Sequence, residues 1–313
     1  MPNELWCCDM VRESNESAAQ LQPLWRDLLV LTKPRITAMC VMMTAGGYGL
    51  AMSATPMLAP SFLPLIWHLF LTILGSYCVI AGSCVLNMYL ERDRDKLMKR
   101  TSQRPLPTGR ITPRVALAWG LFLSFTGVGL LWWINPLTAG LAALALFSYV
   151  CIYTPLKTRT TLFLMVGTIP GAMPPLLGWT AVTQQVDWIG GSLFAIMVLW
   201  QLPHFLALSV MLKKDYALAG VRVAAVTQGE RTVQVQSLLY SVLLLPVSLT
   251  LIPLQVAGWL YAVVAFGSGA WLIAIAMRAL LEQHSQRWAP RLFFASLIYL
   301  PLLTLALLID QFL

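Results

Sequence analysis

Long apolar segments alternate along the chain with short polar connections, and this alternation is the dominant pattern of the sequence. Each segment is apolar throughout instead of apolar at every second position, and most reach the roughly 20 residues with which a helix crosses a bilayer. The pattern predicts an all-α polytopic membrane protein. Its nine predicted spans are residues 36–55, 63–90, 115–134, 137–153, 160–180, 188–210, 237–256, 258–280 and 291–311.

The composition agrees with a membrane protein. Of the 313 residues, 58% are hydrophobic and 11% are charged, against about 25% charged residues in soluble domains. We expect a polar tail over residues 1–27 and one membrane-embedded domain over residues 28–313. Because no soluble domain is predicted, any chemistry must lie in the polar connections and at the helix ends beside them.

The charge distribution predicts the orientation of the helices. All 21 Lys and Arg fall in alternate connections, at residues 1–35, 91–114, 154–159, 211–236 and 278–291. The positive-inside rule places these segments inside, with the N-terminus inside and the C-terminus outside. Lys33 and Arg35 are then expected at the headgroup level. The net charge of +8 is therefore a topology signal, and nucleic acid is not an expected partner.

The N-terminal tail bears on the compartment. It contains the acidic residues Glu4, Asp9, Glu13 and Glu16 and no apolar signal-peptide core. Because mitochondrial presequences are poor in acids, we expect a bacterial inner membrane.

The connection from residue 87 to residue 114 carries three acids among eight Lys and Arg. If the preceding helix continues, Asn87, Glu91 and Asp95 are spaced i, i+4 and i+8, on one helical face. One amide and two carboxylates are hard oxygen ligands, which suit Mg²⁺, and Mg²⁺ takes its other ligands from water and substrate phosphates. The alternative is a solvated, charged helix end.

Further polar residues on the inner side could bind the same phosphates. Guanidinium and ammonium groups are suited to this role, although each could also be a topology charge. Asp215 could add a carboxylate beside the Glu91 and Asp95 face. The candidates are Arg100, Arg104, Lys157, Arg159, Lys213 and Asp215.

Two predicted spans contain residues that are unusual within a bilayer. Residues 166–179 include three Pro and three Gly, which indicate either a cavity lined by broken backbone or a simple kink. Gln201 and His204 lie in an otherwise apolar segment, where polar residues mark functional sites by default. His204 could bind a metal or haem iron, or both residues could form interhelical hydrogen bonds. If the helix continues to Lys213, His204 lies roughly 14 Å deeper.

Several stretches together resemble the UbiA-type membrane prenyltransferases, and W-Q-L-P-H-F resembles their haem-modifying branch. The resemblance implies a nine-helix bundle whose active site faces the cytoplasm. Glu91 stands where this family usually has Asp, and Asp215 is what remains of its second acidic motif. The stretches are L-T-K-P-R-I-T (31–37), N-M-Y-L-E-R-D-R-D (87–95) with R-T-S-Q-R-P-L (100–106), Y-T-P-L-K-T-R-T (153–160), I-P-G-A-M-P-P-L-L-G-W (169–179), W-Q-L-P-H-F (200–205) and D-Y-A-L-A-G (215–220).

The resemblance implies Mg²⁺-dependent transfer of the farnesyl group of farnesyl diphosphate to a vinyl group of haem B, giving haem O. It implies that Gln201 and His204 bind haem. Haem A synthase or a terminal oxidase assembly would be a partner beyond the substrates and the bilayer. The implied catalytic residues are Asn87, Glu91, Asp95 and Lys157, of which the first three hold the metal, and the implied diphosphate-binding residues are Arg100, Arg104, Arg159, Lys213 and Asp215.

Two rival functions fit part of the pattern. An aromatic prenyltransferase that acts on quinone precursors would share the acidic motif but would need a pocket for a small phenol. A transporter would explain broken helices and intramembrane polar residues. Transporter sites, however, lie near the bilayer midplane, whereas the charges of this chain gather at the inner end.

Overall fold

The computed structural model describes residues 23–55, 62–281 and 287–311, and these residues form helices and no strands. The long helices are α3 (Pro34–Ala54), α4 (Phe62–Asp95), α5 (Pro113–Ile134), α6 (Pro136–Phe147), α8 (Phe163–Thr183), α9 (Trp188–Met211), α12 (Glu230–Ser248), α13 (Trp259–Leu281) and α14 (Trp288–Asp310). The short helices are α2 (Leu24–Leu31), η2 (Ser148–Tyr153), α7 (Thr154–Leu156), α10 (Lys213–Leu218), α11 (Ala224–Thr227) and η3 (Leu249–Leu251).

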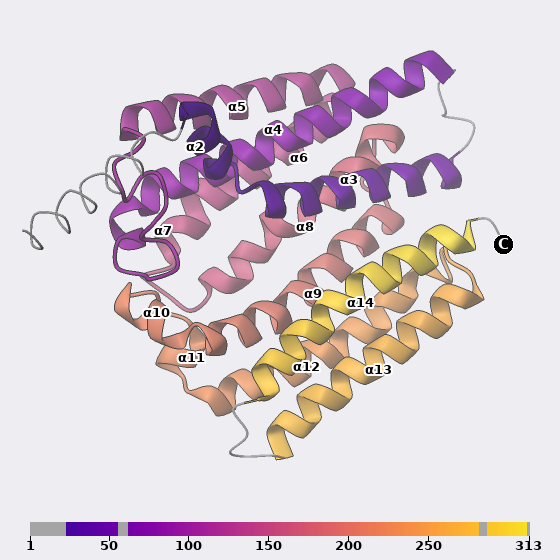
Figure 1. The fold of residues 1–313 in the computed structure, drawn as a ribbon. Coiled ribbons are helices and arrows are strands. Elements are labelled where there is room, and N and C mark those ends of the chain that lie inside the picture. The colour runs from indigo at the N-terminus through magenta and orange to yellow at the C-terminus, as the bar shows by residue number, and fades with distance from the viewer. Residues whose placement is uncertain (1–22, 56–61, 282–286, 312–313) are drawn as a thin grey trace, which may run out of the picture.

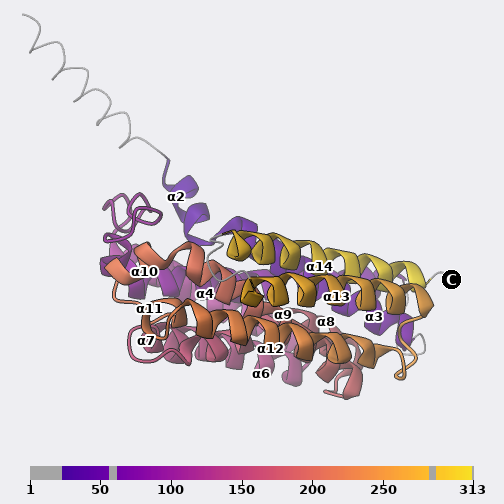
Figure 2. The same ribbon diagram turned by 90° about the horizontal axis from the view of Figure 1, so that it is seen from below.

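The long helices lie side by side in one bundle, with α8 packed between α3 and α9 (Figure 1). The short helices α2, α7, α10 and α11 gather at one end of this bundle, and α14 ends at the other (Figures 1 and 2). The polar connections that the charge pattern assigns to the inside therefore meet at a single end.

Eight helices in the described part of the chain are long and apolar enough to cross a membrane, so the protein is a multi-pass membrane protein. Each matches one of the predicted spans, where α6, η2 and α7 run on as one span over Pro136–Leu156. The remaining predicted span, 160–180, is α8, which has a similar length but contains Pro170, Pro174 and Pro175. The count of nine spans stays a prediction.

The prolines and glycines of α8 lie where this helix packs closely against α3 and beside a cavity. It is helical from Phe163 to Thr183, and its second half is buried without interruption. A Cβ atom at Gly47 of α3 would collide with the Pro175 carbonyl, and one at Gly178 would collide with the Thr44 carbonyl. The two backbones therefore touch. Pro175 also lines an apolar cavity of about 70 Å³ between α3, α8, α9 and α14, so close packing and a cavity occur together.

Three helix ends differ from the predicted ones. α4 continues to Asp95, which meets the condition for the i, i+4, i+8 face. α9 stops at Met211, one residue after the predicted end, because Leu212 leaves the helical region (φ −104°, ψ 19°), so the condition of one continuous helix from His204 to Lys213 is not met. α12 starts at Glu230, earlier than predicted, directly after Gly229 with its positive φ of 86°.

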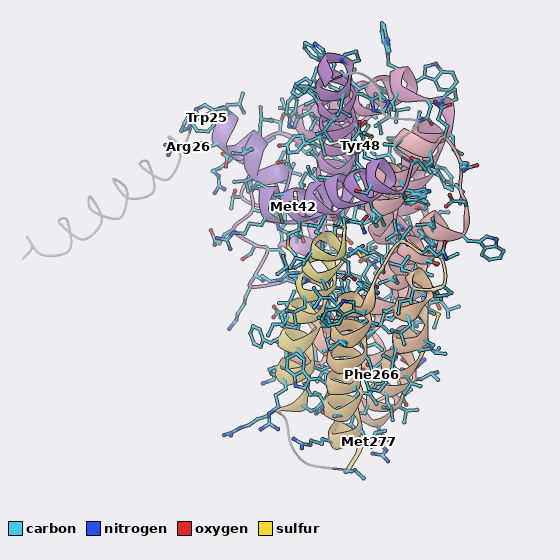
Figure 3. The ribbon with its side chains drawn as sticks, turned by 90° about the vertical axis from the view of Figure 1, so that its right-hand side faces the viewer. Trp25, Arg26, Met42, Tyr48, Phe266 and Met277 are labelled. Carbon is cyan, nitrogen blue, oxygen red and sulfur yellow. The ribbon has the colours of Figure 1, made fainter. Side chains whose placement is uncertain are left out.

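The predicted boundary between a tail and the membrane domain, at residues 27 and 28, falls within α2. Residues 1–22 lie outside the described residues. α2 packs against α4 and α5, and Trp25 and Arg26 on it project sideways beyond the other helices (Figure 3). Its remaining face is buried at Asp27 and Leu31.

Candidate active site

The last two turns of α4 present three oxygen-bearing side chains on one buried face. Asn87, Glu91 and Asp95 are 1%, 9% and 1% exposed. The Asn87 amide Nδ2 donates to Glu91 Oε2 over 2.9 Å. The spacing predicted for a continued helix therefore brings these three residues together at the end of the bundle where the polar connections meet.

Lys157 neutralises Glu91 from the next connection. Its Nζ lies 2.7 Å from Glu91 Oε1 and 2.9 Å from Oε2, and 4.6 Å from the centre of the Tyr153 ring. Burial lowers the pKa of Lys157, but Tyr153 and the Glu91 carboxylate outweigh this effect and raise it above its usual value. Lys157 therefore stays protonated. The adjacent Thr154 hydroxyl accepts from Asn87 Nδ2 over 3.1 Å.

Arg104 neutralises Asp95 from the loop that follows α4. Its Nη1 lies 2.7 Å from Asp95 Oδ2. The Thr101 hydroxyl donates to the backbone carbonyl of Asp95 over 2.8 Å, so the loop folds back over the end of its own helix. Each carboxylate on the α4 face thus has its own cationic partner.

Lys33 is a third cation at the site, although the charge pattern predicts for it only a place at the headgroup level. Its Nζ donates to Asn87 Oδ1 over 3.1 Å. The residue has left-handed backbone (φ 50°, ψ 62°) directly before Pro34, the first residue of α3. Burial lowers the pKa of the Lys33 ammonium, and the nearby Arg104 and Lys157 lower it further. The Lys-Pro pair was the available signal, because Pro34 fixes where α3 begins.

The structure does not bring every predicted phosphate ligand to this face. Arg100, Arg159 and Lys213 are exposed, and Asp215 is partly exposed. Among the residues that the structure describes, no group of three or more His, Cys, Asp and Glu is close enough to hold a metal, so Asp215 does not join the α4 carboxylates. The roles of these four residues stay predictions.

The loop that contains Asp215 nevertheless packs beside the site. The Arg222 backbone N–H donates to the Lys157 carbonyl over 2.9 Å, and its guanidinium donates to the Arg159 carbonyl over 3.0 Å. In α10, burial raises the pKa of the Tyr216 phenol, which lies near the charges of Arg100 and Lys157. This loop holds Lys157 in place through its backbone.

Gln201 and His204 are buried in α9 and form interhelical contacts away from the α4 face. His204 Nδ1 lies 2.8 Å from the Ser296 hydroxyl of α14, and its ring stacks on Trp200 and on Phe293, with centroids 5.2 and 4.5 Å away. Gln201 Nε2 donates to the Thr168 carbonyl of α8 over 3.5 Å and to the Met197 carbonyl, one turn earlier in α9, over 2.9 Å. Since Ser296 engages Nδ1, Nε2 is the nitrogen that a haem iron would use.

The site combines hard oxygen donors with three cations. A group with several negatively charged oxygens, such as a diphosphate, can attract Lys33, Lys157 and Arg104, and the carboxylates they release can bind a divalent cation. The arrangement therefore suits chemistry on a diphosphate ester at the polar end of a membrane bundle.

Known proteins share both the sequence and the fold. The profile of the UbiA prenyltransferase family matches residues 40–298. A protoheme IX farnesyltransferase of Anaeromyxobacter sp. (strain Fw109-5) is 43% identical over 90% of this chain and 92% of its own length. One of Sorangium cellulosum (strain So ce56) is 47% identical over 77% of this chain and 87% of its own length.

Solved structures agree with the fold. A digeranylgeranylglyceryl phosphate synthase structure superposes with a TM-score of 0.75 at 17% identity, over 92% of this chain and 98% of the other. A UbiA homolog from Archaeoglobus fulgidus bound to GPP and Mg²⁺ gives a TM-score of 0.62 at 16% identity, over 90% and 99%. The profile match, the close relatives and the shared fold lead to one conclusion: the chain belongs to the UbiA prenyltransferase family, whose members are prenyl-transferring enzymes.

Proposed function

We propose that this enzyme transfers the farnesyl group of farnesyl diphosphate to a vinyl group of haem B, which gives haem O and releases diphosphate. The choice of substrates rests on the relatives named protoheme IX farnesyltransferase. The observation that supports the chemistry is the buried α4 face, on which Glu91 and Asp95 each form an ion pair with a different basic side chain.

The oxygen donors of this face fit Mg²⁺. Asn87, Glu91 and Asp95 supply one amide and two carboxylates, all buried, and a solved structure of the same fold contains Mg²⁺ with a prenyl diphosphate. When bound there, Mg²⁺ would supply positive charge to the diphosphate. We assign Asn87, Glu91 and Asp95 as its ligands. Glu91 is one methylene longer than Asp and still offers a carboxylate.

The three cations around the face act on the leaving group. Lys33, Lys157 and Arg104 bind diphosphate oxygens and stabilise the negative charge that develops as the bond between farnesyl C1 and oxygen breaks. Before the substrate arrives they are held beside the α4 face by Asn87, Asp95 and Glu91. Arg100, Arg159, Lys213 and Asp215, at the edge of the site, would bind the diphosphate as it enters or leaves.

The apolar interior of the bundle protects the farnesyl cation from water. A haem vinyl group captures C1 of this cation, which forms the new carbon–carbon bond. Water then adds to the porphyrin side chain and loses a proton, which leaves a hydroxyethylfarnesyl substituent. His204, through Nε2, and Gln201 are the proposed haem-binding residues.

We also propose nine spans in a bacterial inner membrane, with the active site facing the cytoplasm. The positive-inside rule supports this orientation, because the three cations of the site lie in the connections that carry all the Lys and Arg. Haem A synthase or a terminal oxidase assembly would receive the product.

The experiment that tests this function uses purified protein in lipid nanodiscs with farnesyl diphosphate, haem B and Mg²⁺. Haem O and diphosphate are measured together by mass spectrometry and a coupled assay. We expect both products from the wild type in equal amounts. Prenylation of 4-hydroxybenzoate without any haem O would instead establish the quinone-precursor reaction.

A further inference from the structure

Helix α2 buries an acid at a place where nothing in the proposed reaction requires one. Asp27 is 3% exposed, although its neighbours Trp25 and Arg26 are largely exposed. A buried carboxylate is costly unless it is paired. The residue that pairs with Asp27 therefore indicates which part of the protein α2 is attached to.

The partner of Asp27 is Arg110, at the far end of the loop that follows α4. Arg110 Nε lies 3.1 and 3.2 Å from the two carboxylate oxygens, and Arg110 Nη2 donates to the Gln103 carbonyl over 3.3 Å. Apolar contacts reinforce this ion pair, because Leu31 of α2 belongs to one buried cluster with Leu106 and Ile111 of the same loop. α2 therefore holds residues 103–111 at several points.

The same loop supplies a cation of the active site. Arg104, next to Gln103, binds Asp95 over 2.7 Å, and the Arg104 carbonyl accepts from the Thr108 hydroxyl over 2.9 Å. α2 also ends at Leu31, two residues before Lys33, whose Nζ binds Asn87. Two of the three cations around the α4 face are thus connected to α2, one through Arg110 and one directly along the chain.

We propose that α2 is a brace for the diphosphate end of the site and that Asp27 is a positioning residue acting through Arg110. The brace keeps the loop closed on α4, so that Arg104 and Lys33 are in place when the substrate binds. It touches no reacting atom. The expected effect on KM rests on the proposed function. The expected effect on the stability of the loop can be measured without any substrate.

The test compares Asp27→Asn with the wild type in the full-length protein in nanodiscs. Loss of one charged hydrogen bond corresponds to about a tenfold change in an equilibrium constant. We therefore expect KM for farnesyl diphosphate to rise about tenfold, while kcat changes less. Amide hydrogen exchange over residues 97–112 should become faster in the same variant without substrate. Asp93→Asn is the matched control, because Asp93 is an exposed acid of α4.

Charge exchange separates positioning from general destabilisation. The double variant Asp27→Arg with Arg110→Asp should restore both the KM and the slow exchange, and Arg110→Gln should reproduce Asp27→Asn if the latter does not purify. Unchanged KM and exchange in the single variants would overturn the proposal, as would a fall in kcat alone that the double variant does not reverse. If exchange changes as expected but the wild type transfers no farnesyl group, the brace stands and the proposed function fails.

Discussion

Glu91 and Lys157 are joined through both carboxylate oxygens, and they come from segments 66 positions apart. Both carboxylate oxygens lie within 2.9 Å of the same ammonium group. Removal of one partner of a buried pair leaves an uncompensated charge, which typically costs about 3–5 kcal/mol. Substitutions at this pair must therefore be judged by stability as well as by rate.

We expect Glu91→Gln to lower the rate of farnesyl transfer by about 100-fold or more, the usual effect of removing an electrostatic group from an active site. Glu91→Asp should keep substantial activity, because it retains the carboxylate. Initial rates at saturating farnesyl diphosphate, on protein that is monodisperse by size-exclusion chromatography, check this. Full activity of Glu91→Gln would refute the assignment, and Asp93→Asn provides the baseline.

Lys33 offers a second test with a neighbouring control. Lys33→Met should weaken binding of farnesyl diphosphate about tenfold, since it removes one charged hydrogen bond. Arg35→Met should have little effect, because Arg35 is exposed and its side chain forms no hydrogen bond or ion pair with the α4 face in the described part of the chain. KM values measured side by side decide the point, and equal values for the two variants would make Lys33 a topology charge only.

His204 is tested by spectroscopy. The His204→Ala variant should shift the Soret band of bound haem B, while release of diphosphate from farnesyl diphosphate continues. His68→Ala is the control, because His68 Nδ1 bonds Tyr48 over 3.0 Å near the other end of the bundle. If the spectrum and haem O formation are unchanged in His204→Ala, the residue only packs between Trp200 and Phe293.

At the scale of the elements, the backbones of α3 and α8 approach each other closely at Gly47 and Pro175. Gly47→Ala should destabilise the protein, because its Cβ would collide with the Pro175 carbonyl, and overpacking typically costs about 1–3 kcal/mol. Gly49→Ala, two residues further along α3, meets nothing within 4 Å and should be neutral. Thermal unfolding in detergent compares them, and equal melting temperatures would contradict this packing.

The long helices can be predicted well from the sequence, because a long apolar segment is itself the sign of a helix that is surrounded by lipid or protein. The short helices α2, α10 and α11 are missed, since they lie in polar connections where periodicity is weak. The α4 face is predicted because its three residues share one helix. Lys33 is missed for the opposite reason: its bond to Asn87 joins residues 54 positions apart, and only the packing of α3 against α4 creates it.

For the whole molecule, the orientation can be tested by labelling. We expect Gln184→Cys, at the end of α8, to react with an impermeant thiol reagent added from the periplasmic side. Thr108→Cys, in the loop after α4, should stay unlabelled until the membrane is opened. The opposite pattern would reverse the topology and place the α4 face outside the cytoplasm.

The prolines of α8 have a consequence for how the protein is made. Among the long helices of the described chain, α8 is the one with three prolines in its interior, and the backbone groups that these prolines leave unpaired need partners from neighbouring helices within a bilayer. Its second half is covered by other helices in the finished bundle. During synthesis α8 therefore depends on its neighbours α3 and α9 to remain in the bilayer. We expect translation that stops after residue 185, before α9 exists, to leave α8 poorly inserted, whereas α3 and α4 are already anchored.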